Sequence, residues 1–249
     1  MDRAAAMPRI PLARLAADAP AMTATGLAFA ALALPLAWLA ATDPATVDGE
    51  PAWLKPLRFA VSLALWALTL AWAARWIAPA DRARAGVRAA VAVAIAAMAL
   101  EMAWIAGGAV MGVRSHWNVA YLGQAWLYPA MGVVAVTLTA SAALWGVLIL
   151  RAQSAPFPRL VGWSMLATFA LTVPIAGALA GLDGRLAGTP GAGLPLLGWS
   201  LAGDLHPAHF LAVHAMQAVP LAAHALGPRP WLLPGYVALT LAAVGLAVA

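Results

Sequence analysis

The sequence predicts an all-α integral membrane protein, a helical bundle of about seven transmembrane helices. Of its 249 residues, 64% are hydrophobic and only 9% are charged, whereas soluble domains are about half apolar and about a quarter charged. The apolar residues also form runs of the ~20 residues that a spanning helix needs. The chain contains no cysteine, which excludes disulfides, thiolate metal sites and covalently attached c-type haem.

Residues 1–20 are expected to form a cytoplasmic arm and residues 21–249 a single transmembrane domain. The first apolar run is longer than the 7 to 15 residues of a signal-peptide core, so it is interpreted as a retained helix. The fourth run exceeds the bilayer thickness and is expected to tilt, or to begin as an interfacial stretch and kink at Pro129. Gly181–Gly203 is rich in Gly and Pro and is expected to lie as a flap over the outer face. The predicted spans are 21–41, 56–78, 88–110, 122–150, 160–181, 207–226 and 231–249.

The distribution of cations predicts the orientation. Ten of the 14 Lys and Arg residues fall in the N-terminal arm and in every second loop after it. Because cytoplasmic loops carry the excess of Lys and Arg, the N-terminus is placed in the cytoplasm and the chain in the bacterial inner membrane. No basic stripe or nucleic-acid motif occurs, so lipid is the expected surrounding and nucleic acid is not an expected partner.

Polar residues in or beside the spans are functional candidates, because an ionisable group in a membrane is costly unless it is paired or faces water. On the predicted topology most of them lie toward the outer side. His214 and Gln217 continue inward along the sixth span, Glu101 lies near the middle of the third, and His224 lies toward the cytoplasm. The outer group comprises Lys55, Arg58, Arg114, His116, Asn118, Asp204, His206 and His209.

The sixth span carries most of these histidines on one broad polar face, which must point into the bundle. Imidazole is a common ligand of metals and of b-type haem. His209 and His214 are about 140° apart on a regular helix, so they are not expected to share one metal. A haem takes its second ligand from across the bundle, and His116 is the expected complement.

From these positions we predict metal or haem ligation by His116, Asp204, His209 and His214, and cofactor binding by Lys55, Arg58, Arg114 and Gln217. The three cations would form an anion or propionate clamp. Structural alternatives stay open for several of these residues. Asp204 can cap the sixth helix, and His214 and Gln217 can form interhelical hydrogen bonds. Glu101 can be a buried protonated acid, a proton relay, or a partner of Arg58 or Arg114.

The stretches "KPLRFAVS", "GVRSHWN" and "GDLHPAHFLAVHAMQAVP" resemble a family of bacterial multi-helix membrane proteins with no assigned activity. The resemblance covers most of the chain from the second to the sixth span. It departs at Trp117, where the family pattern has Phe, and at His206, where it has Arg. The matching positions are Lys55, Phe59, Ser62, Ser115, His116, Asn118, Gly203, Asp204, Leu205, His209, Phe210, His214 and Gln217.

Three function classes follow, and no catalytic residue is assigned in any of them. The first is binding of b-type haem or a transition metal for electron transfer or oxidoreductase chemistry, with a quinone or another membrane redox protein as partner. The second is a membrane zinc hydrolase, superficially similar to the alkaline-ceramidase and adiponectin-receptor group, although the last-helix HxxxH and the HExxH motif are missing. The third is a transporter, sensor or assembly subunit without enzymatic activity. Oligomerisation is left open.

Overall fold

The computed structural model describes residues 11–116, 126–181, 199–200 and 202–249, and these are predominantly helical. One short β-hairpin, β1 (Thr46–Val47) and β2 (Glu50–Pro51), separates the first two long helices. The helices are α1 (Leu12–Asp18), α2 (Pro20–Thr42), α3 (Leu54–Ala73), the 3-10 turn η1 (Ala74–Trp76), α4 (Pro79–Arg82), α5 (Ala85–Val110), α6 (Leu127–Ala152), α7 (Pro156–Gly181), α8 (His206–Leu226) and α9 (Leu232–Val248).

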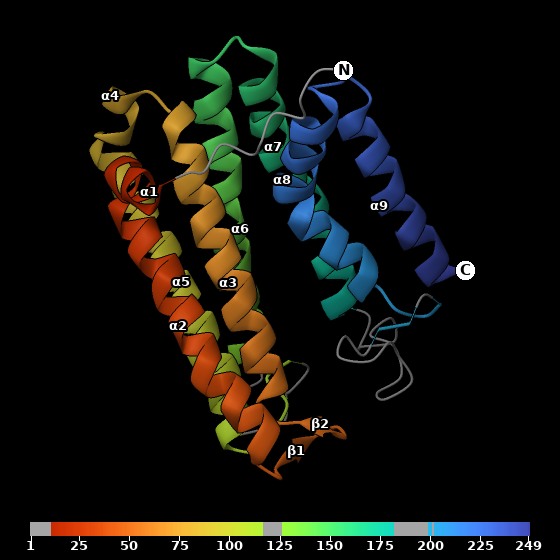
Figure 1. Cartoon of the computed structure of the whole chain (residues 1–249). Helices are drawn as coiled ribbons and strands as arrows, with labels where there is room; N and C mark the ends of the chain where they lie inside the picture. The colour runs from red at the N-terminus through yellow and green to blue at the C-terminus, as the bar shows by residue number, and fades with distance from the viewer. Residues whose placement is uncertain (1–10, 117–125, 182–198, 201) are drawn as a thin grey trace.

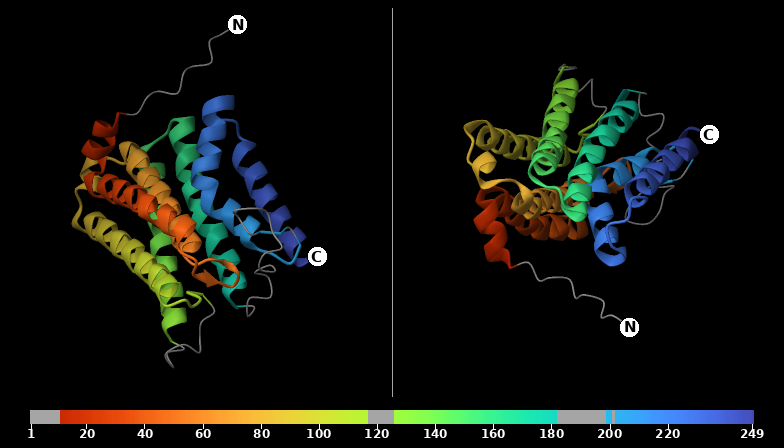
Figure 2. Two further views of the ribbon diagram at one scale, coloured as in Figure 1. Left: turned by 60° about the horizontal axis from the view of Figure 1, so that its bottom comes forward. Right: turned by 90° about the horizontal axis from the view of Figure 1, so that it is seen from above.

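The long helices run up and down the molecule, and each packs on its neighbour in the chain (Figure 1). Seen along the bundle, α2, α3 and α5 lie on one side and α8 and α9 on the other, with α6 and α7 between them (Figure 2). The β-hairpin marks one end, here called the hairpin end. The opposite end, here called the arginine end, holds α1, α4 and the α6–α7 and α8–α9 connections (Figure 1).

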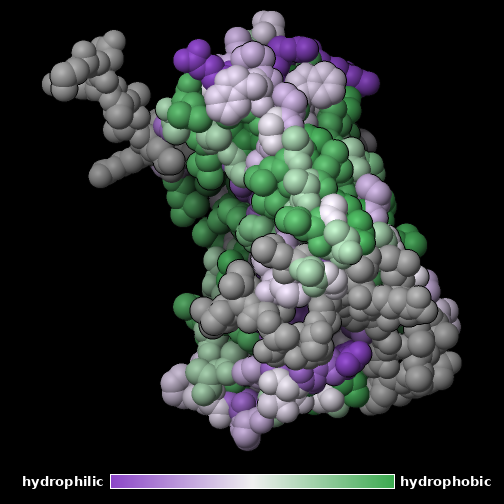
Figure 3. Space-filling view, turned by 90° about the vertical axis from the view of Figure 1, so that its right-hand side faces the viewer, coloured by the Kyte–Doolittle hydropathy of each residue, from purple (hydrophilic) through white to green (hydrophobic). Residues whose placement is uncertain are grey.

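Five helices are long and apolar enough to cross a membrane, so the multi-pass helical character predicted from the sequence is confirmed. These five are α2, α3 with η1, α5, α6 and α7. The other two predicted spans also form helices, but α8 carries four histidines and α9 has only 17 residues. On the side of α8 and α9, hydrophobic side chains cover the middle of the described surface, with hydrophilic ones at the upper end (Figure 3). This banding is typical of a protein surrounded by lipid.

The structure differs from the sequence prediction at three places. The fourth helix begins at Leu127, so Pro129 lies in the first helical turn, where its missing N–H removes no hydrogen bond, and not at a kink. Residues 12–18 of the expected arm form α1, which packs on α2 and α3. The β-hairpin was not predicted. Residues 122–125 of the fourth span and most of the Gly181–Gly203 segment lie outside the described residues.

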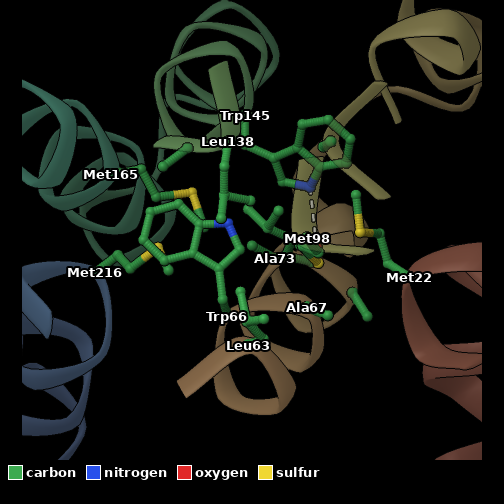
Figure 4. Packing of buried hydrophobic residues seen from close by; sticks show 14 of the residues in the cluster. Met22, Leu63, Trp66, Ala67, Ala73, Met98, Leu138, Trp145, Met165 and Met216 are labelled. Carbon is green, nitrogen blue, oxygen red and sulfur yellow. Dashed lines mark hydrogen bonds between the residues drawn. The ribbon is translucent and has the colours of Figure 1, made fainter. Parts of the chain in front are cut away.

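Two tryptophans tie α3 to α6 in the core. The indole N–H of Trp66 donates to Ser141 Oγ at 3.1 Å, and that of Trp145 donates to the carbonyl of Leu70 at 2.9 Å. Both rings are buried, and methionines from four other helices pack around them (Figure 4). Because each buried indole N–H has an acceptor, neither tryptophan leaves an unsatisfied polar atom in the core.

Candidate functional site

Residues 111–115, here called the return turn, follow α5 and bring polar residues to the hairpin end of the bundle. Gly112 adopts φ +66°, and the Val113 N–H donates to the carbonyl of Gly108 at 2.9 Å, which is the geometry of a Schellman C-cap. The chain then folds back onto α5, where Ser115 packs against Gly108. The indole of Trp104 donates to the Ser115 carbonyl. These contacts fix the residue that follows, His116.

His116 meets Lys55, from the first turn of α3, across the bundle. Lys55 Nζ lies 3.1 Å from Nδ1 of His116. An ammonium group can only donate, so Nδ1 accepts and the ring proton of the neutral imidazole is assigned to Nε2. The pKa of His116 lies well below its ordinary value, because burial penalises the charged ring and the nearby Lys55 cation repels it. The pair is therefore an ammonium bound to a neutral imidazole.

Aromatic and hydroxyl groups surround this pair. The ring of Phe59 lies 6.2 Å from that of His116, and the ring of Tyr128, on α6, lies 5.9 Å away, centroid to centroid. Ser115 Oγ lies 3.1 Å from His116 Nδ1. The half-buried Lys55 and His116 thus lie in a setting of low polarity, where a charged contact is stronger than in water.

The β-hairpin supplies carboxylates to both arginines of the predicted anion clamp. Its turn residues Asp48 and Gly49 have φ of 54° and 80°, as the favoured two-residue hairpin turn requires. Glu50 accepts two contacts from the Arg58 guanidinium, at 3.0 and 3.3 Å. Asp48 accepts from Arg114 at 2.7 Å. Arg58 and Arg114 lie where the sequence analysis expected them, but each already holds an acid.

Glu101 lies deeper in the bundle, below the return turn. It is only 5% exposed, and in the described part of the chain it makes no hydrogen bond or ion pair. The cation whose charge acts on it is Lys55. The expectation that Glu101 pairs with Arg58 or Arg114 is therefore wrong, because the hairpin acids hold those two cations.

Asp204 lies two residues before the first residue of α8, next to the N-cap Leu205. Its side chain is fully buried, and Oδ2 accepts the Ser200 N–H at 2.8 Å. Oδ1 accepts the backbone N–H of His206 at 2.9 Å and lies 2.7 Å from the His206 ring nitrogen Nδ1. Asp204 thus accepts a free N–H at the start of the helix, as the sequence analysis considered, but from the residue before the N-cap Leu205, and both of its carboxylate oxygens are engaged.

The other predicted residues of α8 follow one another from the hairpin end toward the arginine end. His209 lies on the first turn of α8, and its charge contributes to lowering the pKa of His116. His214 packs on Phe210, with ring centroids 4.2 Å apart. The Gln217 amide nitrogen donates to Thr69 Oγ1 of α3 at 3.1 Å, which is the interhelical hydrogen bond considered for it. His224 is exposed at the arginine end.

Three residues that the sequence analysis did not assign to the site belong to its structure. These are Asp48, Glu50 and Thr69, to which the sequence analysis gave no role. The Asp-Gly pair between Val47 and Glu50 was the available signal, since Asp-Gly is typical of a tight hairpin turn. Asn118 lies outside the described residues.

The described residues contain no group of three or more His, Asp or Glu that could hold a metal ion. Comparison with known proteins gives no further assignment, because no family model, curated protein or solved structure matches the chain.

Proposed function

We propose that the chain spans the bacterial inner membrane seven times, with the N-terminus in the cytoplasm, and that the hairpin end is the outer one. Five helices have the required length and apolarity, and α8 and α9 complete the count. The described arginines of the predicted cytoplasmic set lie in α1, η1 and α4, at the nearby ends of α5, α6 and α7, or in the α4–α5 and α8–α9 connections, all at the arginine end. This clustering supports the proposed orientation through the positive-inside rule.

Within this topology we propose that the hairpin end binds a small anion, such as a carboxylate, as part of a transporter or sensor without enzymatic activity. The contact between Lys55 Nζ and His116 Nδ1 carries this proposal. It leaves two ammonium N–H groups of Lys55 as donors, and donors are what an anion needs.

The charge around the pair supports the same function. Asp48 and Glu50, the two acids of the hairpin, are held by Arg114 and Arg58. The carboxylate of Asp204 is likewise engaged, by the backbone N–H groups of Ser200 and His206. Lys55 is thus left to attract an anion at a site where Phe59 and Tyr128 reduce competition from water.

The test is calorimetric titration of the detergent-solubilised protein with sodium acetate, repeated with inorganic phosphate and with chloride. Wild type should bind at least one of these anions, and Lys55→Gln should lower its affinity about 10- to 100-fold, since a hydrogen bond to a charged group contributes about 1.5 to 3 kcal/mol. Arg84→Gln is the matched control, because this exposed cation lies at the other end and pairs with Asp81. Equal affinities in wild type and Lys55→Gln would overturn the proposal.

A b-type haem or a transition metal, used for electron transfer, is the second candidate, and the electrostatic influence of His209 on His116 favours it. A ligating imidazole normally donates its other N–H to an acceptor, whereas His116 Nδ1 faces the Lys55 ammonium. Ligation at Nε2 therefore requires Lys55 to withdraw. A Soret band in the visible spectrum of the purified protein, lost in His116→Ala and His209→Ala but not in His224→Ala, would favour haem over the anion site. For a zinc hydrolase, the described residues offer no group of three or more His, Asp or Glu that could hold the zinc ion.

A further inference from the structure

At the arginine end, Arg75 has no acid to pair with. Asp18, one of the two described acids of this end, lies 2.8 Å from Arg82. The other, Asp81, lies 3.0 Å from Arg84. Arg75, in the 3-10 turn η1 that follows α3, makes no ion pair with any residue that the structure describes.

Two indoles and a backbone carbonyl hold the Arg75 guanidinium. Its Nε–H donates to the carbonyl of Trp72 at 2.9 Å. Its Cζ atom lies 5.8 Å from the ring centroid of Trp72 and 5.5 Å from that of Trp76, within the range of a cation–π interaction. The two indoles meet edge to face, with centroids 4.6 Å apart. The cation therefore lies in an ordered aromatic setting.

Trp76 is in turn fixed from α6 and α7. The amide nitrogen of Gln153, just after α6, donates to the Trp76 carbonyl at 2.9 Å. The ring of Phe157, in the first turn of α7, lies 5.8 Å from the Trp76 ring, centroid to centroid. Because separate parts of the chain converge on this turn, the position of Arg75 is set by tertiary contacts, and little ordering remains to be done when a ligand binds.

The guanidinium nevertheless lacks acceptors. It carries five N–H donors, and among the described residues only Nε–H has an acceptor. The Nη2 atom is buried and has no hydrogen-bond partner in the described part of the chain. A buried donor without an acceptor is costly, and more so when it belongs to a charged group. The half-buried Arg75 side chain thus requires an anionic acceptor that the described chain does not supply.

The position of Arg75 indicates which anion this is. It lies next to the last residue of the apolar span Leu54–Trp76, where lipid phosphates are expected, and tryptophans are typical of this interface. We propose that Arg75 binds the phosphodiester of an anionic phospholipid. A guanidinium presents a planar fork to two phosphate oxygens, and the arginines of this end favour lipids of net negative charge. The proposal rests on the proposed topology and not on the anion site at the hairpin end.

The experiment is native mass spectrometry of the full-length protein in detergent, titrated with phosphatidylglycerol and separately with phosphatidylcholine of the same acyl chains. Wild type should prefer phosphatidylglycerol. Arg75→Gln should lower the phosphatidylglycerol affinity about 10- to 100-fold, because charge-assisted hydrogen bonds to the phosphate are lost. Arg84→Gln is the matched control. It removes the same charge at the same end, from an exposed side chain already paired with Asp81, and should lower the affinity less than about threefold.

Four results would overturn the proposal. Equal losses in Arg75→Gln and Arg84→Gln would show a general attraction to the basic end, and equal binding of the two lipids by wild type would show no selection of charge. Displacement of the lipid by millimolar inorganic phosphate would assign the site to a free anion. If Arg75→Gln does not fold, Arg75→Lys decides, because it keeps the charge but loses the planar fork. Its affinity should also be lower, and an affinity equal to that of wild type would be the fourth contradicting result.

Failure of the proposed topology has a separate signature. A protein that carbonate releases from membranes without detergent would overturn the topology and the lipid site together. A protein that requires detergent but fails the lipid titration keeps its topology and loses only this site. Acetate binding at the hairpin end should be the same in Arg75→Gln as in wild type, and an acetate affinity lowered by Arg75→Gln would contradict the independence of the two sites.

Discussion

Lys55, at the first turn of one helix, and His116, six residues beyond the end of another, meet with Nζ 3.1 Å from Nδ1. The contact joins an obligate donor to an imidazole whose pKa lies well below its ordinary value. It sets the proton of the neutral ring on Nε2 and leaves Lys55 with two further N–H donors. The anion site rests on this pair.

Stability should depend on pH through His116. Its pKa is lower in the folded protein than in the unfolded chain, so below about pH 6.5, the usual histidine value, the unfolded state binds a proton that the folded state does not. Stability is therefore lost as pH falls through that range and regained as pH rises. Thermal unfolding in detergent between pH 5 and 8 should show a smaller loss at low pH in His116→Gln than in wild type. Parallel profiles would contradict this assignment.

The return turn should be sensitive to one glycine and tolerant of its neighbour. A Cβ at Gly108 would lie 3.0 Å from the Val113 carbonyl oxygen and 3.3 Å from Ser115, whereas nothing lies within 4 Å of a Cβ at Gly107. Gly108→Ala should displace Ser115 and His116 and weaken acetate binding several-fold. Gly107→Ala should preserve binding and stabilise α5 by about 0.5 to 1 kcal/mol, as expected for Ala over Gly in a helix. Similar acetate affinities in the two variants would show that the turn does not position the site.

The two ion pairs of the hairpin should contribute unequally to the stability of the folded protein. Asp48 and Arg114 are more exposed, with 37% and 53% of their side-chain surface accessible, than Glu50 and Arg58, with 35% and 28%. Asp48→Asn, which tolerates the positive φ, should cost less than about 1 kcal/mol. Glu50→Gln removes the carboxylate from a two-contact pair and should cost about 1 to 2 kcal/mol. Denaturant titration of both variants measures the difference, and a larger loss in Asp48→Asn would reverse the ranking.

The α3–α8 contact offers a fourth prediction. Gln217 Oε1 is buried and has no partner among the described residues, while its amide nitrogen donates to Thr69. Thr69→Val leaves that nitrogen without an acceptor and should cost about 1 to 3 kcal/mol, whereas Gln217→Leu removes both polar atoms and should cost less. The comparison uses thermal unfolding of the two variants. An equal or larger loss in Gln217→Leu would indicate a partner for Oε1.

The helices could be predicted from the sequence, because apolar runs of spanning length leave few alternatives in so hydrophobic a chain. The hydrogen bond of Asp204 to the first residue of α8 and the interhelical hydrogen bond of Gln217 followed from residue type and helical spacing. The partners of the charged residues could not be predicted in the same way. Arg58 and Arg114 were predicted to bind an anion. In the structure they pair with acids of a hairpin, and that hairpin depends on two residues with positive φ, Asp48 and Gly49.

The Lys55–His116 contact could not be predicted from helical periodicity either. It depends on the positive φ of Gly112, which turns the chain back over α5. A residue in a loop has no helical phase from which its neighbours can be deduced, so the sequence placed His116 near α8 but did not identify Lys55 as its hydrogen-bond partner.

The most direct test of the anion site is the ¹⁵N spectrum of the His116 imidazole in detergent, assigned by comparison with His116→Gln and recorded with and without sodium acetate. Near neutral pH the ring should be neutral, with Nε2 protonated and Nδ1 accepting. Acetate should shift both resonances in wild type and neither in Lys55→Gln. A ring proton on Nδ1, or resonances that acetate leaves unchanged in wild type, would contradict the account.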